Sequence, residues 1–200
     1  MKDLSRPEGA AELYEELADL RSEVEMLINN AGVGMLGFFA ELDTGKQMEM
    51  LRLNVDALTY LTRLFVPAMV ARHKGYVLNV ASTAAFQPGP LMAVYYASKA
   101  YVVSFSSALH NELKPHRVVV TTLCPGPTQT DFQRRAQMEA TRLFRGTTMS
   151  STIVARIGFE AMMRGKPLVV AGRLNALMAF LTRFAPRQMA ASIARRMQEV

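Results

Sequence analysis

A tyrosine and a lysine four residues apart form the pattern in this sequence that is best suited to chemistry. Tyr95 and Lys99 fall in a stretch that predicts a helix, so their side chains share one helical face. A free tyrosine titrates near pH ~10 and is a poor acid or base at neutral pH. Because a nearby ammonium stabilises the phenolate and lowers its pKa, we expect this pair to exchange a proton with a substrate oxygen.

A serine could take part in the same proton transfer. Ser82 ends the apolar run that precedes Tyr95, and its hydroxyl could donate to the substrate oxygen as charge develops there. On spacing alone, a tyrosine and a lysine four apart are common. The alternative is that Tyr95 and Lys99 have no catalytic role and lie on a helix surface at the edge of the core.

Apolar runs and helical periods alternate along the chain, which predicts strands and helices in turn. The expected strands cover residues 25–28, 76–81, 117–123 and 168–171. The expected helices cover residues 10–22, 44–73, 95–113, 131–144 and 151–164, before a basic amphipathic tail at 173–197. Such alternation predicts an α/β fold, a doubly wound parallel sheet with helices on both faces.

The longest predicted helix, residues 44–73, carries signals for its beginning and for an interruption. Thr44 is the expected N-cap, with Gln47 as its capping-box partner. Pro67 predicts a kink or a break, because proline lacks the amide hydrogen that a helix interior needs.

Three loops are expected on one rim of the sheet. Residues 29–32, Ser82 and residues 125–130 each follow a predicted strand directly. In parallel sheets ligands bind beyond the carboxyl ends of the strands, so we expect the ligand site at these loops.

Five short motifs occur in one order with regular gaps. They are Asn29-Asn30-Ala31-Gly32, Asn54-Val55, Asn79-Val80-Ala81-Ser82, Tyr95-Tyr96-Ala97-Ser98-Lys99 and Pro125-Gly126-Pro127-Thr128-Gln129-Thr130. The series resembles the classical short-chain dehydrogenase/reductase family over nearly the whole chain. The resemblance implies a Rossmann-like domain over residues 1–200. It also implies an enzyme that transfers a hydride between NADP or NAD and a small-molecule carbonyl or alcohol. The 14 methionines of the chain are interpreted as core filling, and a pocket for an apolar substrate is the alternative.

The resemblance assigns catalytic roles to Asn54, Ser82, Tyr95 and Lys99. Tyr95 is the implied acid-base, and Lys99 lowers its pKa and holds the nicotinamide ribose. Ser82 orients the substrate oxygen, and Asn54 anchors a water-linked proton path to the lysine. Cofactor contacts are implied for Asp3, Leu4, Asn30, Ala31, Gly32, Tyr95, Lys99, Pro125, Gly126, Thr128 and Thr130.

The family pattern opens with a strand, a Gly-rich turn and a helix whose N-terminus takes the cofactor's pyrophosphate. We expect this chain to be N-terminally truncated relative to that pattern. A literal Gly-x-Gly-x-x-Gly does occur at Gly32, Gly34 and Gly37. We reject it as the phosphate-binding motif, because no helix is expected to open within it.

Composition limits the remaining possibilities. Two hundred residues suit a single domain, and one cysteine, Cys124, suits a reducing compartment, which favours a cytoplasmic location. We expect a homo-oligomer. No metal-ligand spacing joins the three histidines to Cys124, so no metal site is predicted. No RNA-binding or zinc signature supports contact with nucleic acid.

The basic charge lies at the C-terminal end. Residues 134–200 carry 12 Lys and Arg against 3 Asp and Glu, whereas residues 1–133 carry 11 against 14. Residues 172–200 are interpreted as a basic amphipathic extension. Packing over the substrate pocket or at a subunit interface is the favoured interpretation. Peripheral contact with an anionic membrane is the alternative.

Two functions remain open at this stage. The first is a working oxidoreductase. The second is a truncated, catalytically impaired relative that acts as a binding or membrane-peripheral module.

The 200-residue chain alone is expected to bind NAD(P) weakly, with a dissociation constant above about 1 mM, because no Gly-rich cradle or helix N-terminus would meet the pyrophosphate charges. Titration calorimetry measures this directly. A low-micromolar dissociation constant would contradict either the expected truncation or the rejection of the Gly32–Gly37 motif.

Overall fold

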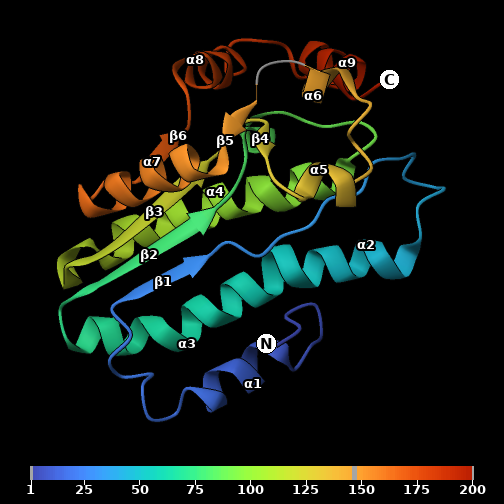
Figure 1. The fold of residues 1–200 in the computed structure, drawn as a ribbon. Helices are drawn as coiled ribbons and strands as arrows, with labels where there is room; N and C mark the ends of the chain where they lie inside the picture. The colour runs from blue at the N-terminus through green and yellow to red at the C-terminus, as the bar shows by residue number, and fades with distance from the viewer. Residues whose placement is uncertain (1, 146–147, 200) are drawn as a thin grey trace.

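The computed structural model describes residues 2–145 and 148–199. Its main sheet has four parallel strands in the order β1-β2-β3-β6 (Figure 1). The strands are β1 (Met26–Asn29), β2 (Gly75–Val80), β3 (Val118–Cys124) and β6 (Leu168–Val170). The parallel α/β fold that the sequence predicts is therefore confirmed, and each strand lies within about a residue of its predicted place.

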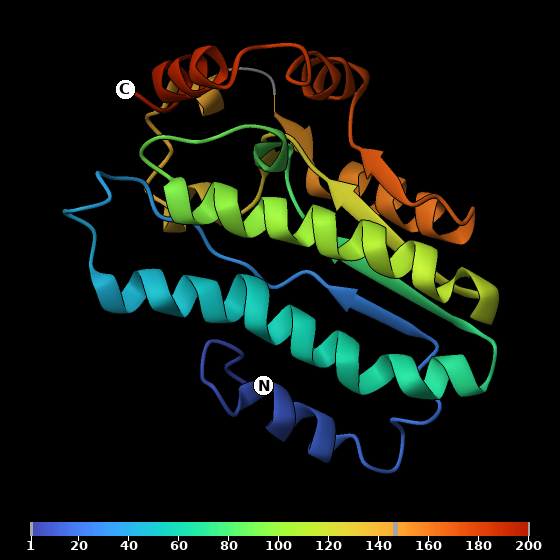
Figure 2. The ribbon, with the colours of Figure 1, turned by 180° about the vertical axis from the view of Figure 1, so that it is seen from behind.

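Helices cover both faces of this sheet (Figures 1 and 2). On one face, α3 (Leu58–Ala71) and α4 (Ala93–Leu113) pack on Val77 and Val120, and α1 (Gly9–Glu16) packs outside α3. On the other face, α7 (Ser151–Met163) packs on Leu78 and Leu123. Successive strand residues are thus apolar on opposite faces, as a parallel sheet buried on both sides requires.

A chain of buried polar side chains joins the sheet to α3 and α4, the two helices on one of its faces. The side-chain amide of Asn29 on β1 donates to the Thr62 hydroxyl at 3.0 Å and to the Asn79 amide oxygen at 2.8 Å. Asn79 on β2 donates in turn to the Ser106 hydroxyl on α4, at 2.8 Å. All four side chains are buried. The network therefore fixes α3, β1, β2 and α4 relative to one another.

The long helix expected at residues 44–73 is present but is divided differently. It consists of α2 (Thr44–Leu51), a π-helical segment η1 (Arg52–Ala57) and α3. Its N-cap is Asp43, whose carboxylate accepts from the Lys46 amide at 2.8 Å, so the predicted Thr44 cap is wrong by one residue. The helix continues through Pro67, and the predicted break there is wrong.

The C-terminal half shows further departures. The helix expected at 131–144 is instead two short pieces, α5 (Phe132–Arg135) and α6 (Arg142–Arg145). The expected amphipathic tail forms two helices, α8 (Arg173–Leu181) and α9 (Arg187–Gln198), broken where Pro186 precedes α9. The small elements are η2 (Thr83–Phe86), η3 (Lys114–His116), and the strands β4 (Thr128–Gln129) and β5 (Met149–Ser150), which pair in parallel. No helix within the described ranges is long and apolar enough to cross a membrane.

Asn79→Ala is expected to lower the free energy of unfolding by about 2–3 kcal/mol, because the Ser106 hydroxyl and part of the Asn29 amide lose their partners inside the core. Urea unfolding followed by circular dichroism measures the change. Ser107→Ala, at an exposed position one residue along α4, is the control and should change stability little. A loss below about 1 kcal/mol for Asn79→Ala would show that the network contributes little.

Candidate functional site

The carboxyl ends of the strands bring the predicted loops together. The backbone amide of Ala81, just after β2, donates to Leu123 on β3 at 2.8 Å, and that of Thr83 donates to Pro125 at 2.8 Å. Ser82 therefore lies beside the start of the 125–130 loop. The structure confirms that these loops share one rim of the sheet.

Ser82 faces Tyr95 at this rim. Ser82 is in an extended conformation, and its hydroxyl accepts from the Ala84 amide at 3.1 Å, which fixes it at the N-terminus of η2. The same hydroxyl lies close enough to the phenol of Tyr95, on the first turn of α4, to lower the pKa of that phenol. The structure therefore places side by side the serine and the tyrosine that the sequence singles out, and their roles toward a substrate stay a prediction.

Burial controls the acidity of Tyr95. The side chain is only 9% exposed, and removal from water raises its pKa to about 12, although the nearby Ser82 hydroxyl acts in the opposite direction. The sequence predicts a lowered pKa through Lys99, and the structure shows the reverse. The physical reason is that the phenolate has lost its hydration while the ammonium is directed elsewhere.

Lys99 lies beneath Tyr95 and is itself buried. Its Nζ donates to the backbone oxygen of Val80 at 3.0 Å and lies 5.8 Å from the centre of the Tyr95 ring. Burial lowers the pKa of Lys99 to about 8. The ammonium is therefore near the phenol, on the helical face that the four-residue spacing predicts, but its hydrogen bond is with the strand.

Asn54 closes the other side of the lysine. It lies in the π-helical segment η1, where its amide donates to the Val33 oxygen at 2.9 Å and to the Ser98 hydroxyl at 3.1 Å, and its oxygen accepts from the Val33 amide at 3.0 Å. A Cβ added to Gly32 would lie 3.2 Å from both Lys99 Nζ and Asn54 Oδ1. The Gly32 backbone thus closely borders the lysine and the asparagine, and the ribose contact that the resemblance implies for Lys99 stays a prediction.

The 125–130 loop is held by its own side chains. The Thr128 hydroxyl donates to the Gly126 oxygen at 2.9 Å, and the Thr130 hydroxyl accepts from the Phe132 amide at 3.2 Å. A Cβ on Gly126 would lie 2.4 Å from the Asn175 amide of α8. Gly126 is therefore needed for close packing of the C-terminal region, and the two threonines stabilise the turn at the rim.

Asp3 and Leu4, near the N-terminal end, make their contacts with residues other than those around Tyr95. The Asp3 carboxylate accepts from the backbone amide and the hydroxyl of Ser5, at 2.9 and 2.7 Å, and these bonds lower its pKa. Leu4 packs against the core beneath α1. The adenine contact that the resemblance implies for Asp3 and Leu4 stays a prediction.

The Gly32–Gly37 motif does not open a helix. The chain from residue 30 to residue 43 is irregular, and the next helix is α2. Gly37 has a φ of +154°, and a Cβ there would lie 2.7 Å from Leu42, so this glycine serves a tight loop. No helix N-terminus follows directly to meet a phosphate, which agrees with the rejection made from the sequence.

Cys124 lies behind the site. It is fully buried, and burial raises the pKa of its thiol to about 12, although the nearby Lys99 amine and Ser82 backbone act in the opposite direction. Within residues 2–145 and 148–199 the structure contains no cluster of histidine, cysteine, aspartate or glutamate that could hold a metal ion.

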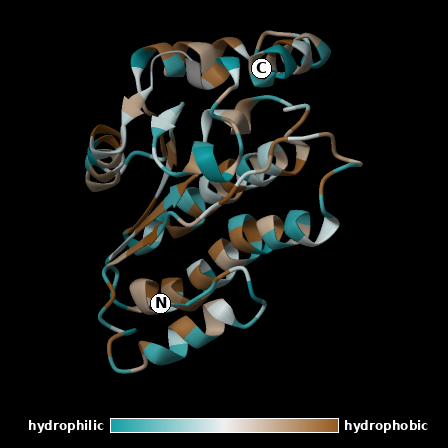
Figure 3. Cartoon of the chain, turned by 45° about the vertical axis from the view of Figure 1, so that its right-hand side comes forward, coloured by the Kyte–Doolittle hydropathy of each residue, from teal (hydrophilic) through white to brown (hydrophobic). Residues whose placement is uncertain are grey.

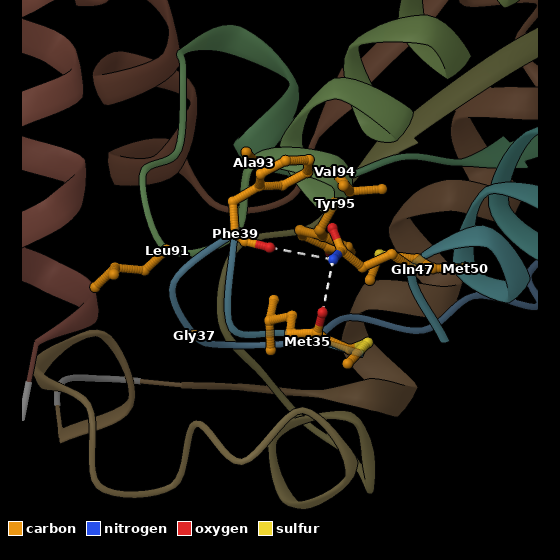
Figure 4. Close-up of a pocket in the computed structure, with 10 residues that line it drawn as sticks. Met35, Gly37, Phe39, Gln47, Met50, Leu91, Ala93, Val94 and Tyr95 are labelled. Atoms are coloured by element: carbon orange, nitrogen blue, oxygen red, sulfur yellow. Dashed lines mark hydrogen bonds between the residues drawn. The ribbon is translucent and has the colours of Figure 1, made fainter. Parts of the chain in front are cut away.

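A small apolar pocket adjoins Tyr95, and the sequence reasoning missed its one buried amide. The pocket measures about 20 Å³ and includes Met35, Phe39 and Met50 (Figure 4). Gln47 lines it and donates to the backbone oxygens of Phe39 and Leu42, at 3.3 and 3.1 Å. Its Oε1 is buried without a partner among the described residues. The sequence signal for this amide was a polar residue, Gln47, on the apolar face of a predicted helix. The capping-box role assigned to Gln47 explained that residue without a place in the site.

A second missed contact joins the C-terminal helix to α4. The buried side chain of Gln198 on α9 donates to the Tyr96 hydroxyl at 2.6 Å. Tyr96 is adjacent to Tyr95, so α9 is attached directly beside the site. No periodicity in the sequence relates two residues so far apart.

Comparisons with known proteins show which family this chain is similar to. Residues 1–140 match the family model described as short chain dehydrogenase. The chain is 32% identical over 163 residues to 17-beta-hydroxysteroid dehydrogenase type 3 of Mus musculus, covering 80% of this chain and 52% of that protein. It is 36% identical over 107 residues to a very-long-chain 3-oxoacyl-CoA reductase of Anas platyrhynchos, covering 52% and 34%.

Solved structures show the same fold. A short-chain dehydrogenase from Sphingobium yanoikuyae in complex with NADPH superposes with a TM-score of 0.79 at 25% identity, covering 96% of this chain and 77% of that one. The chain spans about a third to a half of the length of the first curated relatives that it matches.

The buried amine of Lys99 gives a pH test of the site. Its folded pKa of about 8 lies below the ordinary 10.5, so the unfolded chain binds the proton more tightly. Burial of the charge therefore costs stability fully below pH 8, and the cost disappears as the pH rises to 10.5. Lys99→Met should be more stable than the parent by up to about 3 kcal/mol at pH 7, with the difference shrinking at higher pH.

Unfolding of both proteins at several pH values measures this effect. Lys46→Met, at an exposed position, is the matched control. A difference for Lys99→Met that does not change between pH 7 and pH 10 would contradict the burial of a charged amine.

Proposed function

Because this chain belongs to the short-chain dehydrogenase family, we propose that it transfers a hydride between NADP or NAD and an apolar carbonyl or alcohol, with Tyr95 as the acid-base. The observation that carries the proposal is the contact between the Ser82 hydroxyl and the Tyr95 phenol, with the buried Lys99 amine behind them. The solved relative that binds NADPH supports NADP as the first cofactor to test.

The residues can each be given a task in carbonyl reduction. The bound nicotinamide would supply the hydride to the carbonyl carbon. Tyr95 donates its phenolic proton to the carbonyl oxygen, and Ser82 donates a hydrogen bond to the same oxygen as negative charge develops there. The products are the alcohol and a Tyr95 phenolate. Oxidation of an alcohol uses the same groups in reverse.

Lys99 must stabilise that phenolate. A tyrosine pKa of about 12 disfavours the charged form at neutral pH, so proton transfer requires a cation close to the phenolate oxygen. The Lys99 amine is near enough to approach the phenol when it releases the Val80 oxygen. Asn54, which contacts the loop beside Lys99, would anchor the water-linked path that returns the proton.

The substrate class follows from the pocket and from the relatives. Methionine, leucine and phenylalanine side chains surround Tyr95, and Gln47 supplies one buried amide oxygen without a partner there. Two relatives are named for a steroid and for a very-long-chain acyl group. The pocket of about 20 Å³ is too small to enclose such a molecule, so an apolar ketone would meet Tyr95 at the open rim, with this apolar lining beside it.

Tyr95→Phe should lower kcat/KM for an apolar ketone by about 100-fold or more while leaving the fold intact, because only the proton-donating hydroxyl is removed. NADPH oxidation followed by absorbance measures the rate, and circular dichroism checks the fold. Tyr60→Phe, an exposed tyrosine on α3, is the control. Retention of more than about a tenth of the parent rate by Tyr95→Phe would overturn the acid-base assignment.

A further inference from the structure

Helix α8 has an unusual orientation of its apolar side chains. Leu174, Leu177, Met178, Leu181 and Phe184 recur at helical spacing along α8 and the turn that follows it, and all five are exposed. Leu174 is 71% exposed, Leu177 53% and Phe184 72%. The inward side of α8 carries the small Ala179 and the polar Asn175, whose amide donates to Ala171. The large apolar groups thus point to solvent.

Helix α9 repeats this arrangement. Met189, Ile193 and Met197 follow one another at intervals of four residues and are exposed. Its inward side is already occupied by Ala190, Ala194 and Gln198, which are all buried. Both helices therefore pack inward through small or polar side chains. Packing over the substrate pocket does not account for their large apolar groups.

The two helices lie at one end of the molecule, opposite α1 (Figures 1 and 2). Figure 3 shows apolar positions alternating with hydrophilic ones along this end. The site is adjacent, since Gln198 of α9 contacts Tyr96 and the Arg195 guanidinium lies 5.8 Å from the ring of Phe38, in the loop that borders the pocket.

Positive charge surrounds the exposed apolar groups. Residues 172–200 carry five arginines and one acidic residue. The acidic residue, Glu199, pairs with Arg195 at 3.2 Å. Arg173, Arg183, Arg187 and Arg196 are exposed, and among the residues that the structure describes none of these four pairs with a carboxylate.

We propose that α8 and α9 form a docking surface for an anionic lipid bilayer. Exposed apolar groups flanked by arginine suit a helix that lies in the plane of the headgroups, with its apolar side chains in the acyl boundary. At nine residues, α8 is about 14 Å long, less than half of the ~30 Å hydrocarbon core, so the helix lies along the surface.

Charge favours the bilayer over a second copy of the chain. A two-fold contact through this surface would bury two identical patches of the same positive sign against each other, and Glu199, the one acidic residue of each patch, already pairs with Arg195. An anionic headgroup layer instead supplies the complementary charge along the whole surface. The location beside Tyr95 also places the site where an apolar substrate dissolved in the bilayer could reach it.

Vesicle sedimentation tests the proposal without reference to turnover. The chain should sediment at physiological salt with phosphatidylcholine vesicles that contain phosphatidylserine, and much less with phosphatidylcholine alone. Leu177→Glu/Phe184→Glu and Arg183→Glu/Arg187→Glu should each weaken binding by about tenfold or more. The matched controls are Leu20→Glu for apolar exposure and Lys46→Glu/Arg63→Glu for charge, both at exposed positions elsewhere.

A second measurement locates the contact. The chain contains no tryptophan, so Leu177→Trp introduces a single reporter on α8, with Leu20→Trp as control. The emission of Leu177→Trp should shift to the blue on addition of anionic vesicles, and that of Leu20→Trp should not. Absence of sedimentation, or sedimentation unchanged by the α8 variants, would overturn the proposal. Self-association that Leu177→Glu/Phe184→Glu abolishes, without vesicle binding, would instead assign the surface to a second copy.

Discussion

The position of α4 depends on amide hydrogen bonds inside the core. Asn79 joins α4 to β2 through Ser106, and Asn54 joins the same helix to the π-helical segment through Ser98. Ser98 also donates to the backbone oxygen of Tyr95. A buried amide with fixed partners tolerates little displacement, because any shift leaves a polar group unpaired. The tyrosine and the lysine are therefore held at the rim by contacts that lie one to three helical turns away.

The fold could be predicted from the sequence largely because its signals are local. The β2 and β3 runs are apolar and β-branched, and the helix from Ala93 to Leu113 is bounded in the sequence by Pro90 before it and Pro115 after it. The contact between Ser82 and Tyr95 also follows from local signals, since both residues lie directly at element ends on the same rim. Resemblance to a family then supplied the roles that spacing alone left open.

Other features of the structure could not be predicted from local patterns in the sequence. The hydrogen bond from Lys99 to the Val80 oxygen, and the rise in the pKa of Tyr95, depend on how deeply three elements bury one another. The orphaned oxygen of Gln47 depends on where the 33–42 loop places its carbonyls. The direction in which α8 presents its leucines depends on what packs beneath it. Periodicity predicts that a helix has an apolar side, but not whether that side faces the core.

The burial of Cys124 provides a way to follow the opening of this site. It is the only thiol in the chain, and it lies fully buried between the backbone of Ser82 and the amine of Lys99. A buried thiol with a pKa of about 12 is almost entirely protonated, and it becomes reactive only when the rim separates. The rate at which a thiol reagent labels the chain therefore measures how often this rim opens, without any introduced probe.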